Sequence, residues 1–143
     1  MNSILQTLVK GFTYSGEFLH IFINYSLIIL TISSLVIIRK IDVSHSIKPW
    51  FKAFFISFSL QIFLWFFPGA EGVSVVWCTM TGFGLIHLLQ NKLESNNAKY
   101  ILLGISLIPS LFVNIYYFLT FPPITTVAHL LAILMGMLLG RKN

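Results

Sequence analysis

Five apolar runs of about twenty residues fill most of the chain after residue 16, and a helix needs about that many to cross a bilayer. Only 9% of the residues are charged and 57% are hydrophobic, and the mean hydropathy is +0.88. Such a composition predicts an integral membrane protein rather than a soluble domain. We therefore expect an all-α fold in which residues 17–143 form one five-span helical bundle. The expected spans are about 17–38, 50–68, 73–91, 100–119 and 124–140.

The basic residues lie in alternate connections, so eight of the nine Lys and Arg residues share one side of the predicted bundle. Because cytoplasmic loops carry an excess of Lys and Arg, this pattern predicts a cytoplasmic C-terminus and an external N-terminus. The net charge of +5 then reflects membrane topology, and no nucleic-acid partner is expected. Composition is compatible with a bacterial cytoplasmic membrane. The eight residues are Arg39, Lys40, Lys48, Lys52, Lys92, Lys99, Arg141 and Lys142, whereas Lys10, Glu17 and Glu71 lie on the other side.

Residues 1–16 are too short to cross a bilayer. They also lack the basic start and cleavable apolar core of a signal peptide. We expect an interfacial turn or a short amphipathic helix, with Ile4, Leu5, Leu8 and Phe12 as its lipid-facing side.

No motif in the chain is typical of a metal or cofactor site. There is no Cys pair, no HExxH sequence and no glycine loop of the phosphate-binding kind. The single cysteine, Cys78, excludes an intrachain disulfide. We therefore expect neither a metal nor a cofactor.

Polar residues interrupt three of the apolar runs at a similar depth. If the first, third and fifth spans enter from the same side, Asn24, Thr81 and His129 lie roughly 8 to 12 Å below it. His20 lies one helical turn from Asn24. Polar groups in hydrocarbon are costly, and several that converge usually have a function.

Small residues in the third and fifth spans predict close helix packing. Gly82 and Gly84 lie in the third span, and Ala132, Gly136 and Gly140 repeat every four residues in the fifth. Small residues let helix backbones approach each other in a membrane. The third span is therefore expected at the centre of the bundle, beside the fifth.

In this order and spacing, the motifs resemble those of the rhomboid intramembrane serine proteases. That family has a His-xxx-Asn helix, then a Gly-x-Ser-Gly helix, then a helix in which the catalytic His precedes Gly-xxx-Gly spacing. This chain reads His20-Ile-Phe-Ile-Asn24, then Thr79-Met-Thr81-Gly82, then His129 followed by Ala132 and Gly136. The similarity covers nearly the whole chain from residue 17 onward.

The resemblance implies a serine-type mechanism in which Thr81 is the nucleophile and His129 is the general base and acid. It implies that Asn24 and His20 donate hydrogen bonds to the oxyanion, with Gly82 supporting the site. The substrate would then be a transmembrane segment, cleaved near the outer face of the lipid bilayer.

The chain departs from the family pattern at several positions, and these departures define an alternative function. Thr81 stands in place of the serine, Thr79 in place of the first glycine, and Leu85 where an aromatic residue often packs against the histidine. We also expect this chain to lack the family's usual first span and lateral loop. The alternative is a catalytically inactive relative that binds transmembrane segments of partner proteins.

A third interpretation treats the polar residues as structural, in an unrelated small bundle such as a transporter subunit or an immunity-type protein. Histidine and asparagine can simply bond a neighbouring helix, and a threonine hydroxyl usually bonds the carbonyl one turn back. We further expect His45 to be solvated in a basic loop, His87 to be a packing or cytoplasmic-side residue, and the tryptophans to be interfacial anchors. These tryptophans are Trp50, Trp65 and Trp77.

Overall fold

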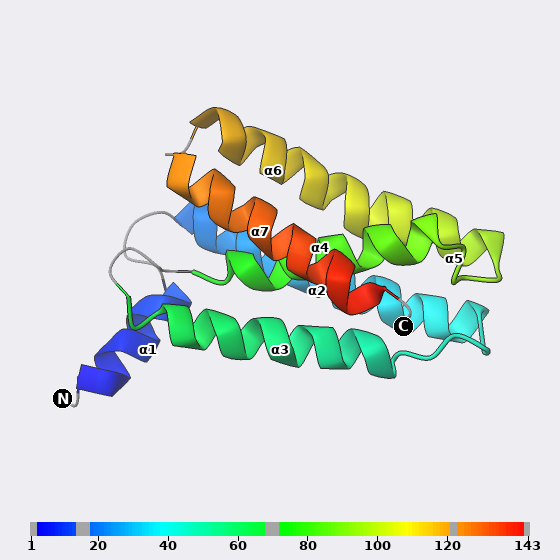
Figure 1. Ribbon diagram of the computed structural model, residues 1–143, viewed down its shortest axis with the longest axis horizontal. Helices are drawn as coiled ribbons and strands as arrows, with labels where there is room; N and C mark the ends of the chain where they lie inside the picture. The colour runs from blue at the N-terminus through cyan, green and yellow to red at the C-terminus, as the bar shows by residue number, and fades with distance from the viewer. Residues whose placement is uncertain (1–2, 14–17, 68–71, 121–122, 142–143) are drawn as a thin grey trace.

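The computed structural model describes residues 3–13, 18–67, 72–120 and 123–141, and these residues are helical with short connections and no strand (Figure 1). The predicted positions Glu17, Glu71 and Lys142 lie outside the described residues. The helices are α1 (Ser3–Thr13), α2 (Phe18–Ile41), α3 (Lys48–Leu64), α4 (Ser74–Leu89), α5 (Asn96–Ile101), the π-helical segment η1 (Leu102–Leu107), α6 (Ile108–Thr120) and α7 (Pro123–Gly140).

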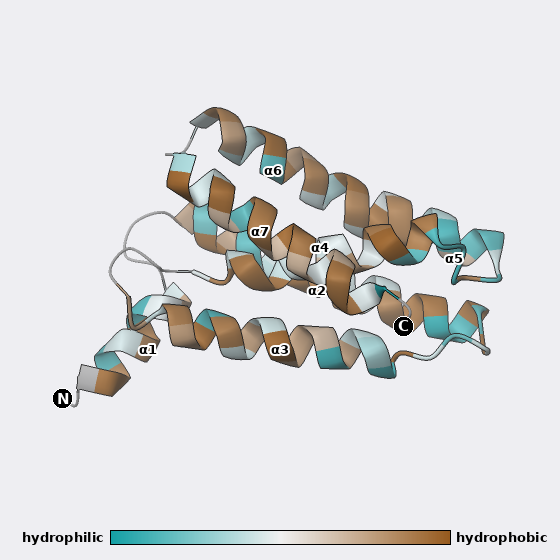
Figure 2. Ribbon diagram, in the orientation of Figure 1, coloured by the Kyte–Doolittle hydropathy of each residue, from teal (hydrophilic) through white to brown (hydrophobic). Residues whose placement is uncertain are grey.

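Three of the described helices are long and apolar enough to cross a membrane. They are α2 with 24 residues, the continuous rod α5–η1–α6 with 25 and α7 with 18. Each of the five predicted spans coincides with a helix, but α3 and α4 have only 17 and 16 residues. Figure 2 shows hydrophobic residues along the long helices and hydrophilic ones gathered around α5 and the adjoining ends of α2 and α3. These features indicate a membrane protein.

The long helices run along a common direction, which gives the bundle two ends (Figure 1). We call one the His20 end, where α2, α4 and α7 begin and α3 and α6 finish. The other is the Asp42 end, where α2, α4 and α7 finish and α3 and α5 begin.

Helix α4 lies at the centre of the bundle, as expected from its small residues. Trp77, Cys78 and Thr79 in this helix are all 0% exposed. A helix buried on every side must be apolar around its whole circumference or must satisfy its polar groups internally. Helix α4 therefore provides most of the contacts that hold the other helices together.

The closest helix contact joins α4 to α7 and depends on glycine. A Cβ built on Gly82 would lie 1.9 Å from the carbonyl oxygen of Ile133, and one on Gly136 would lie 1.9 Å from that of Thr79. Gly140 and Ala132 are buried in the same helix, α7. Gly84, by contrast, faces η1, because its added Cβ would lie 2.9 Å from Leu107.

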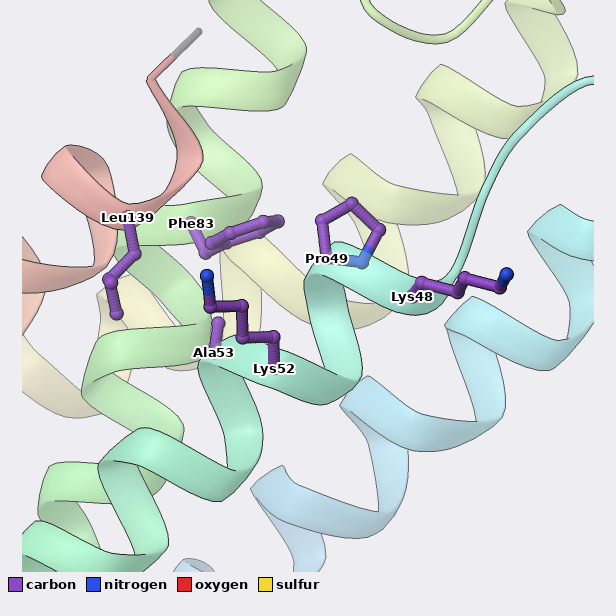
Figure 3. Close-up of a pocket in the computed structure, with 6 residues that line it drawn as sticks. All are labelled: Lys48, Pro49, Lys52, Ala53, Phe83 and Leu139. Atoms are coloured by element: carbon purple, nitrogen blue, oxygen red, sulfur yellow. The ribbon is translucent and has the colours of Figure 1, made fainter. Parts of the chain in front are cut away.

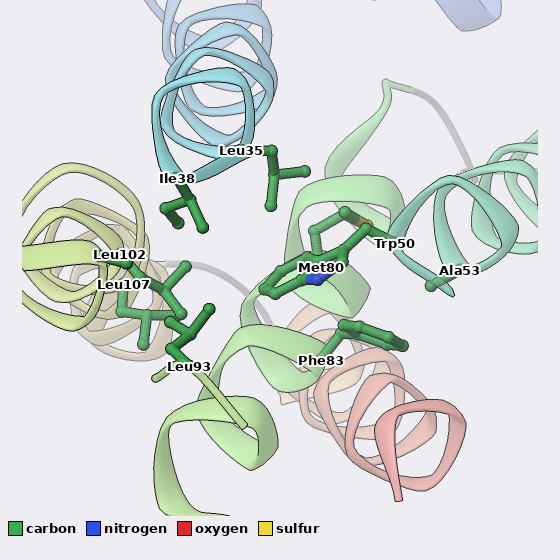
Figure 4. Close-up of a cluster of buried hydrophobic side chains, with 10 residues drawn as sticks. Leu35, Ile38, Trp50, Ala53, Met80, Phe83, Leu93, Leu102 and Leu107 are labelled. Carbon is green, nitrogen blue, oxygen red and sulfur yellow. The ribbon is translucent and has the colours of Figure 1, made fainter. Parts of the chain in front are cut away.

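A hydrophobic core fills the Asp42 end between α2, α3, α4 and η1 (Figure 4). Trp50 is 0% exposed at its centre, and its ring lies 4.8 Å from that of Phe83. Its indole Nε1 donates to His45 Nε2 at 2.9 Å, and His45 is only 6% exposed. The prediction of a solvated His45 is therefore wrong, because the loop folds inward to give the buried indole an acceptor.

The prediction that the tryptophans are interfacial anchors is also wrong. Trp50 and Trp77 are 0% exposed and Trp65 is 6% exposed. Trp65 packs against α1, where its ring lies 4.6 Å from that of Phe12, and its Nε1 donates to the Gly72 carbonyl at 2.7 Å. Large rings near the helix ends thus pack inside the bundle.

Helix α1 lies in the N-terminal segment predicted to be interfacial. Ile4, Leu5 and Phe12 are exposed on it, as expected of a lipid-facing side, whereas Leu8 is half-buried. The helix is attached to the bundle, because the Tyr25 hydroxyl donates to the Phe12 carbonyl at 3.0 Å.

At the Asp42 end, the side chain of Asp42 links the loop between α2 and α3 to the loop between α4 and α5. Its carboxylate accepts from Ser44 Oγ at 2.6 Å and from the backbone N–H groups of Glu94 and Ser95 at 3.0 and 3.3 Å. The hydrogen bond from Ser44 is the main cause that lowers the pKa of Asp42, and the two backbone donors add to it. Three donors on one carboxylate stabilise its charged form.

We expect Asp42→Asn to lower the free energy of unfolding by about 1 kcal/mol, because a carboxamide accepts these hydrogen bonds less strongly. Since the folded-state pKa is lowered, the stabilisation is present above the unfolded-state pKa of about 4 and is lost as pH falls through the folded value. Unfolding in detergent at neutral pH and below pH 4 measures both effects. Glu94→Gln is the control, since this exposed carboxylate makes no hydrogen bond among the described residues. Equal stability of both variants would contradict the prediction.

Candidate functional site

Five side chains from four helices meet at the His20 end, and we call them the His20-end cluster. They are His20 and Asn24 from α2, Trp77 from α4, Tyr117 from α6 and His129 from α7. Asn24, Trp77, Tyr117 and His129 are each at most 4% exposed, and His20 is half-buried. Three of the predicted site residues are therefore gathered in one place, around two aromatic rings.

Trp77 connects α2 to α4 by a buried hydrogen bond. Its indole Nε1 donates to Asn24 Oδ1 at 2.6 Å. The bond uses the oxygen of the Asn24 carboxamide, so the nitrogen Nδ2 faces the other way. An indole N–H buried in an apolar region needs such an acceptor, and this one fixes the orientation of the amide.

Two nitrogen atoms of the cluster converge beside Gly72. Asn24 Nδ2 and His20 Nε2 lie 3.6 and 3.8 Å from the point that a Cβ on Gly72 would occupy. Gly72 has a φ of +81°, a conformation that side chains rarely adopt, so the backbone can approach both groups. Tyr117 Oη lies 3.5 Å from His20 Nδ1, and when the hydroxyl donates there, Nε2 carries the proton. In that tautomer both nitrogen atoms carry hydrogen.

His129 is enclosed by aromatic rings. Its ring centroid lies 5.6 Å from that of Trp77 and 5.4 Å from that of Tyr117. Its Nδ1 is buried and has no hydrogen-bond partner within residues 3–13, 18–67, 72–120 and 123–141. An unpartnered nitrogen at such a depth costs free energy and is a candidate for interaction with a ligand.

Thr81 is buried but does not bond to His129. Its hydroxyl donates to the Trp77 carbonyl one turn back, at 2.8 Å, and it is 1% exposed. Within the described part of the chain no hydrogen bond joins Thr81 to His129. Gly82, next to it, packs against the α7 backbone at Ile133. The proposed nucleophile is therefore bonded within its own helix in this structure.

A cavity of about 250 Å³ opens between α6 and α7 beside His129. Thr126 Oγ1 is buried there with no partner among the described residues, like Nδ1 of His129. The side chain of Asn114 donates to the Ser110 carbonyl at 3.0 Å and accepts from Cys78 Sγ at 3.7 Å. We call this cavity the α6–α7 cleft. It is lined by Leu111, Asn114, Ile115, Phe118, Thr126, His129, Leu130 and Ile133.

Trp77, Tyr117, Asn114 and Thr126 were not predicted as site residues. Trp77 lies four residues before Thr81, and this spacing on one helical face could have identified it. Asn114 interrupts an apolar run, as Asn24 does. Tyr117 and Thr126 carry no such signal, because they lie near span ends where polar tips are common.

The geometry combines hydrogen-bond donors beside Gly72 with unpartnered atoms along a cleft that faces outward from the bundle. Such groups can bind a polypeptide backbone or a polar side chain. No group of three or more His, Cys, Asp and Glu side chains lies together in the described ranges in a way that could hold a metal ion. Compared with known proteins, the chain matches no family model, no curated protein and no solved structure.

Proposed function

We propose that this chain is a rhomboid-like membrane protein that binds a transmembrane segment of a partner protein without cleaving it. In this proposal the chain crosses a bacterial cytoplasmic membrane five times, with its N-terminus and His20 end outside and its C-terminus in the cytoplasm. The gathering of His20 and Asn24 from α2 with His129 from α7, around Trp77 and Tyr117, supports the family assignment. Concentration of Lys and Arg near the Asp42 end supports the orientation.

The observation that carries the binding function is the α6–α7 cleft with its unpartnered polar atoms. His129 Nδ1 and Thr126 Oγ1 are buried without a hydrogen bond in the described part of the chain. Burying a polar group without a hydrogen-bond partner costs free energy. A hydrogen bond with a polar residue on an incoming helix would offset this cost. Exposed apolar residues around the cleft, such as Phe118 and Leu130, provide the contact surface for that helix.

The second candidate is the intramembrane protease with a Thr81–His129 dyad. The closeness of Asn24 Nδ2 and His20 Nε2 to one position beside Gly72 favours it, since hydrogen-bond donors near a developing oxyanion stabilise it. In that mechanism His129 takes the proton of the Thr81 hydroxyl as Oγ1 attacks a peptide carbonyl, and then gives it to the leaving amine. The hydroxyl would first have to leave the Trp77 carbonyl. This hydrogen bond favours the binding function over cleavage.

A reporter helix in reconstituted vesicles tests the binding function. The reporter crosses the bilayer once and carries either one Asn or one Leu in its outer third. We expect the Asn reporter to bind the wild-type protein about tenfold more tightly, because an interhelical hydrogen bond in a membrane contributes about 1–2 kcal/mol. Thr126→Val removes one unpartnered hydroxyl and keeps the shape, so it should reduce this preference several-fold. Energy transfer between labelled protein and reporter measures the affinity.

Thr120→Val is the matched control, because that hydroxyl lies outside the cleft and donates to the Tyr116 carbonyl. Equal binding of both reporters by the wild-type protein would contradict the proposed cleft. Mass spectrometry of the reporter tests the second candidate in the same vesicles. Cleavage that Thr81→Ser retains and that Thr81→Val and His129→Phe both abolish would establish the protease instead.

A further inference from the structure

A second cavity, of about 380 Å³, lies at the Asp42 end, between α3 and the last turn of α7 (Figure 3). Its walls come from Lys48, Pro49, Lys52, Ala53, Phe83 and Leu139. The His20-end cluster and the α6–α7 cleft lie elsewhere in the bundle, and they share no lining residue with it. We call it the α3–α7 pocket.

The rim of the α3–α7 pocket is cationic. Figure 3 shows the Lys52 side chain extending its ammonium toward Phe83 and Leu139, whereas Lys48, one turn earlier, extends in the opposite direction, away from these two residues. Both lysines are exposed, and neither has an ion pair or hydrogen bond within the described ranges. A positive charge over an apolar surface attracts an anion, since little else there can neutralise it.

The floor of the same pocket is apolar. Ala53 and Phe83 are each 1% exposed at its base, and Leu139 forms the edge on α7. Pro49 has no backbone N–H and so adds no donor there. A charged rim above an apolar floor fits a molecule that is itself anionic at one end and apolar at the other.

We propose that the α3–α7 pocket binds an anionic phospholipid. The phosphate lies at Lys52, Lys48 adds positive charge one turn earlier on α3, and an acyl chain lies over Phe83 and Leu139 along the seam between α3 and α7. Helices α2 and α7 finish and α3 begins at this end of the bundle. In the proposed insertion this end lies near the lipid phosphates. Basic pockets between membrane helices bind acidic headgroups in this way. The inference requires membrane insertion but neither of the functions proposed for the His20 end.

Native mass spectrometry of the full-length protein with added phosphatidylglycerol or phosphatidylcholine tests this site. We expect phosphatidylglycerol to bind more tightly. Lys52→Ala should weaken its binding about fivefold and the Lys48→Ala, Lys52→Ala double variant about thirtyfold, since each lysine near an acidic lipid contributes about 1 kcal/mol. Lys40→Ala is the matched control, because this exposed lysine lies on α2 outside the pocket, and we expect it to change binding by less than twofold.

An equal effect of Lys40→Ala and Lys52→Ala would overturn the proposal, because it would indicate attraction by net charge alone. Competition by inorganic phosphate separates a lipid site from a free-anion site. If inorganic phosphate competes as effectively as phosphatidylglycerol itself, the apolar half of the pocket adds no affinity and the lipid assignment is wrong. Unchanged thermal unfolding of the lysine variants confirms that their fold is intact. Binding of transmembrane reporters by these variants should be unaffected, so failure here is distinguishable from failure of the proposed function.

Discussion

A Gly136→Ala variant is expected to lose the packed bundle, with a fall in the free energy of unfolding of about 3 kcal/mol or more. The added methyl group would lie 1.9 Å from the Thr79 carbonyl oxygen and 2.9 Å from the Phe83 backbone nitrogen. Both are backbone atoms of α4, so no side-chain rotation can relieve the contact. Helix α7 would have to move away from α4, and the closest contact in the bundle would open. Unfolding in detergent, followed by circular dichroism, measures the loss.

Gly104→Ala is the matched control for this substitution. A Cβ on Gly104 would meet nothing within 4 Å, so we expect a change of at most about 0.5 kcal/mol. Gly82→Ala should behave like Gly136→Ala, because its Cβ would lie 1.9 Å from the Ile133 carbonyl oxygen. If Gly136→Ala and Gly104→Ala unfolded at the same temperature, that result would contradict the close approach of α4 and α7.

A Trp77→Ala variant is expected to be destabilised by about 3–5 kcal/mol, because it removes a fully buried ring from the middle of the bundle. The ring contacts His129 and Tyr117, and its Nε1 donates to Asn24. Trp77→Phe separates the hydrogen bond from most of the packing. We expect Trp77→Phe to lower the free energy of unfolding by less than Trp77→Ala. Part of this loss comes from leaving the Asn24 oxygen buried without a donor.

A double-mutant cycle isolates the interaction between the two side chains. When Asn24→Leu is combined with Trp77→Phe, we expect the total loss to be smaller than the sum of the two single losses. Phe112→Ala is the control for aromatic removal, because Phe112 is 74% exposed on α6 and should change stability little. Additive losses for Asn24 and Trp77 would contradict a hydrogen bond between them.

The position of Trp77 also bears on which function the cluster performs. Its carbonyl accepts from the Thr81 hydroxyl and its indole donates to Asn24, so one residue bonds both the expected nucleophile and an expected oxyanion donor. Both hydrogen bonds are made within the protein and so form without a bound substrate. Binding of a helix in the α6–α7 cleft, beside His129, needs no change at Thr81.

Much of the architecture is predictable from hydropathy alone. Backbone N–H and C=O groups in hydrocarbon must be paired within the segment, so long apolar runs predict helices whatever their neighbours are. Each predicted range coincides with a helix, and Gly82 and Gly136, two of the small residues in the predicted third and fifth spans, lie at close helix contacts. Whether all five helices cross the bilayer, and in which orientation, stays a prediction.

The partners of the polar side chains were decided by the tertiary structure. From the sequence, Trp77 was predicted to lie at the membrane interface and His45 in solvent. In the structure, Trp77 donates a hydrogen bond to Asn24, and His45 accepts one from Trp50. Thr81 was expected to bond with His129, but its hydroxyl donates to the Trp77 carbonyl in its own helix. Hydropathy along the chain determines which segments become helices, because that requirement is local. Which polar atoms meet depends on the rotation of each helix and on its neighbours, and only packing of the whole bundle determines these.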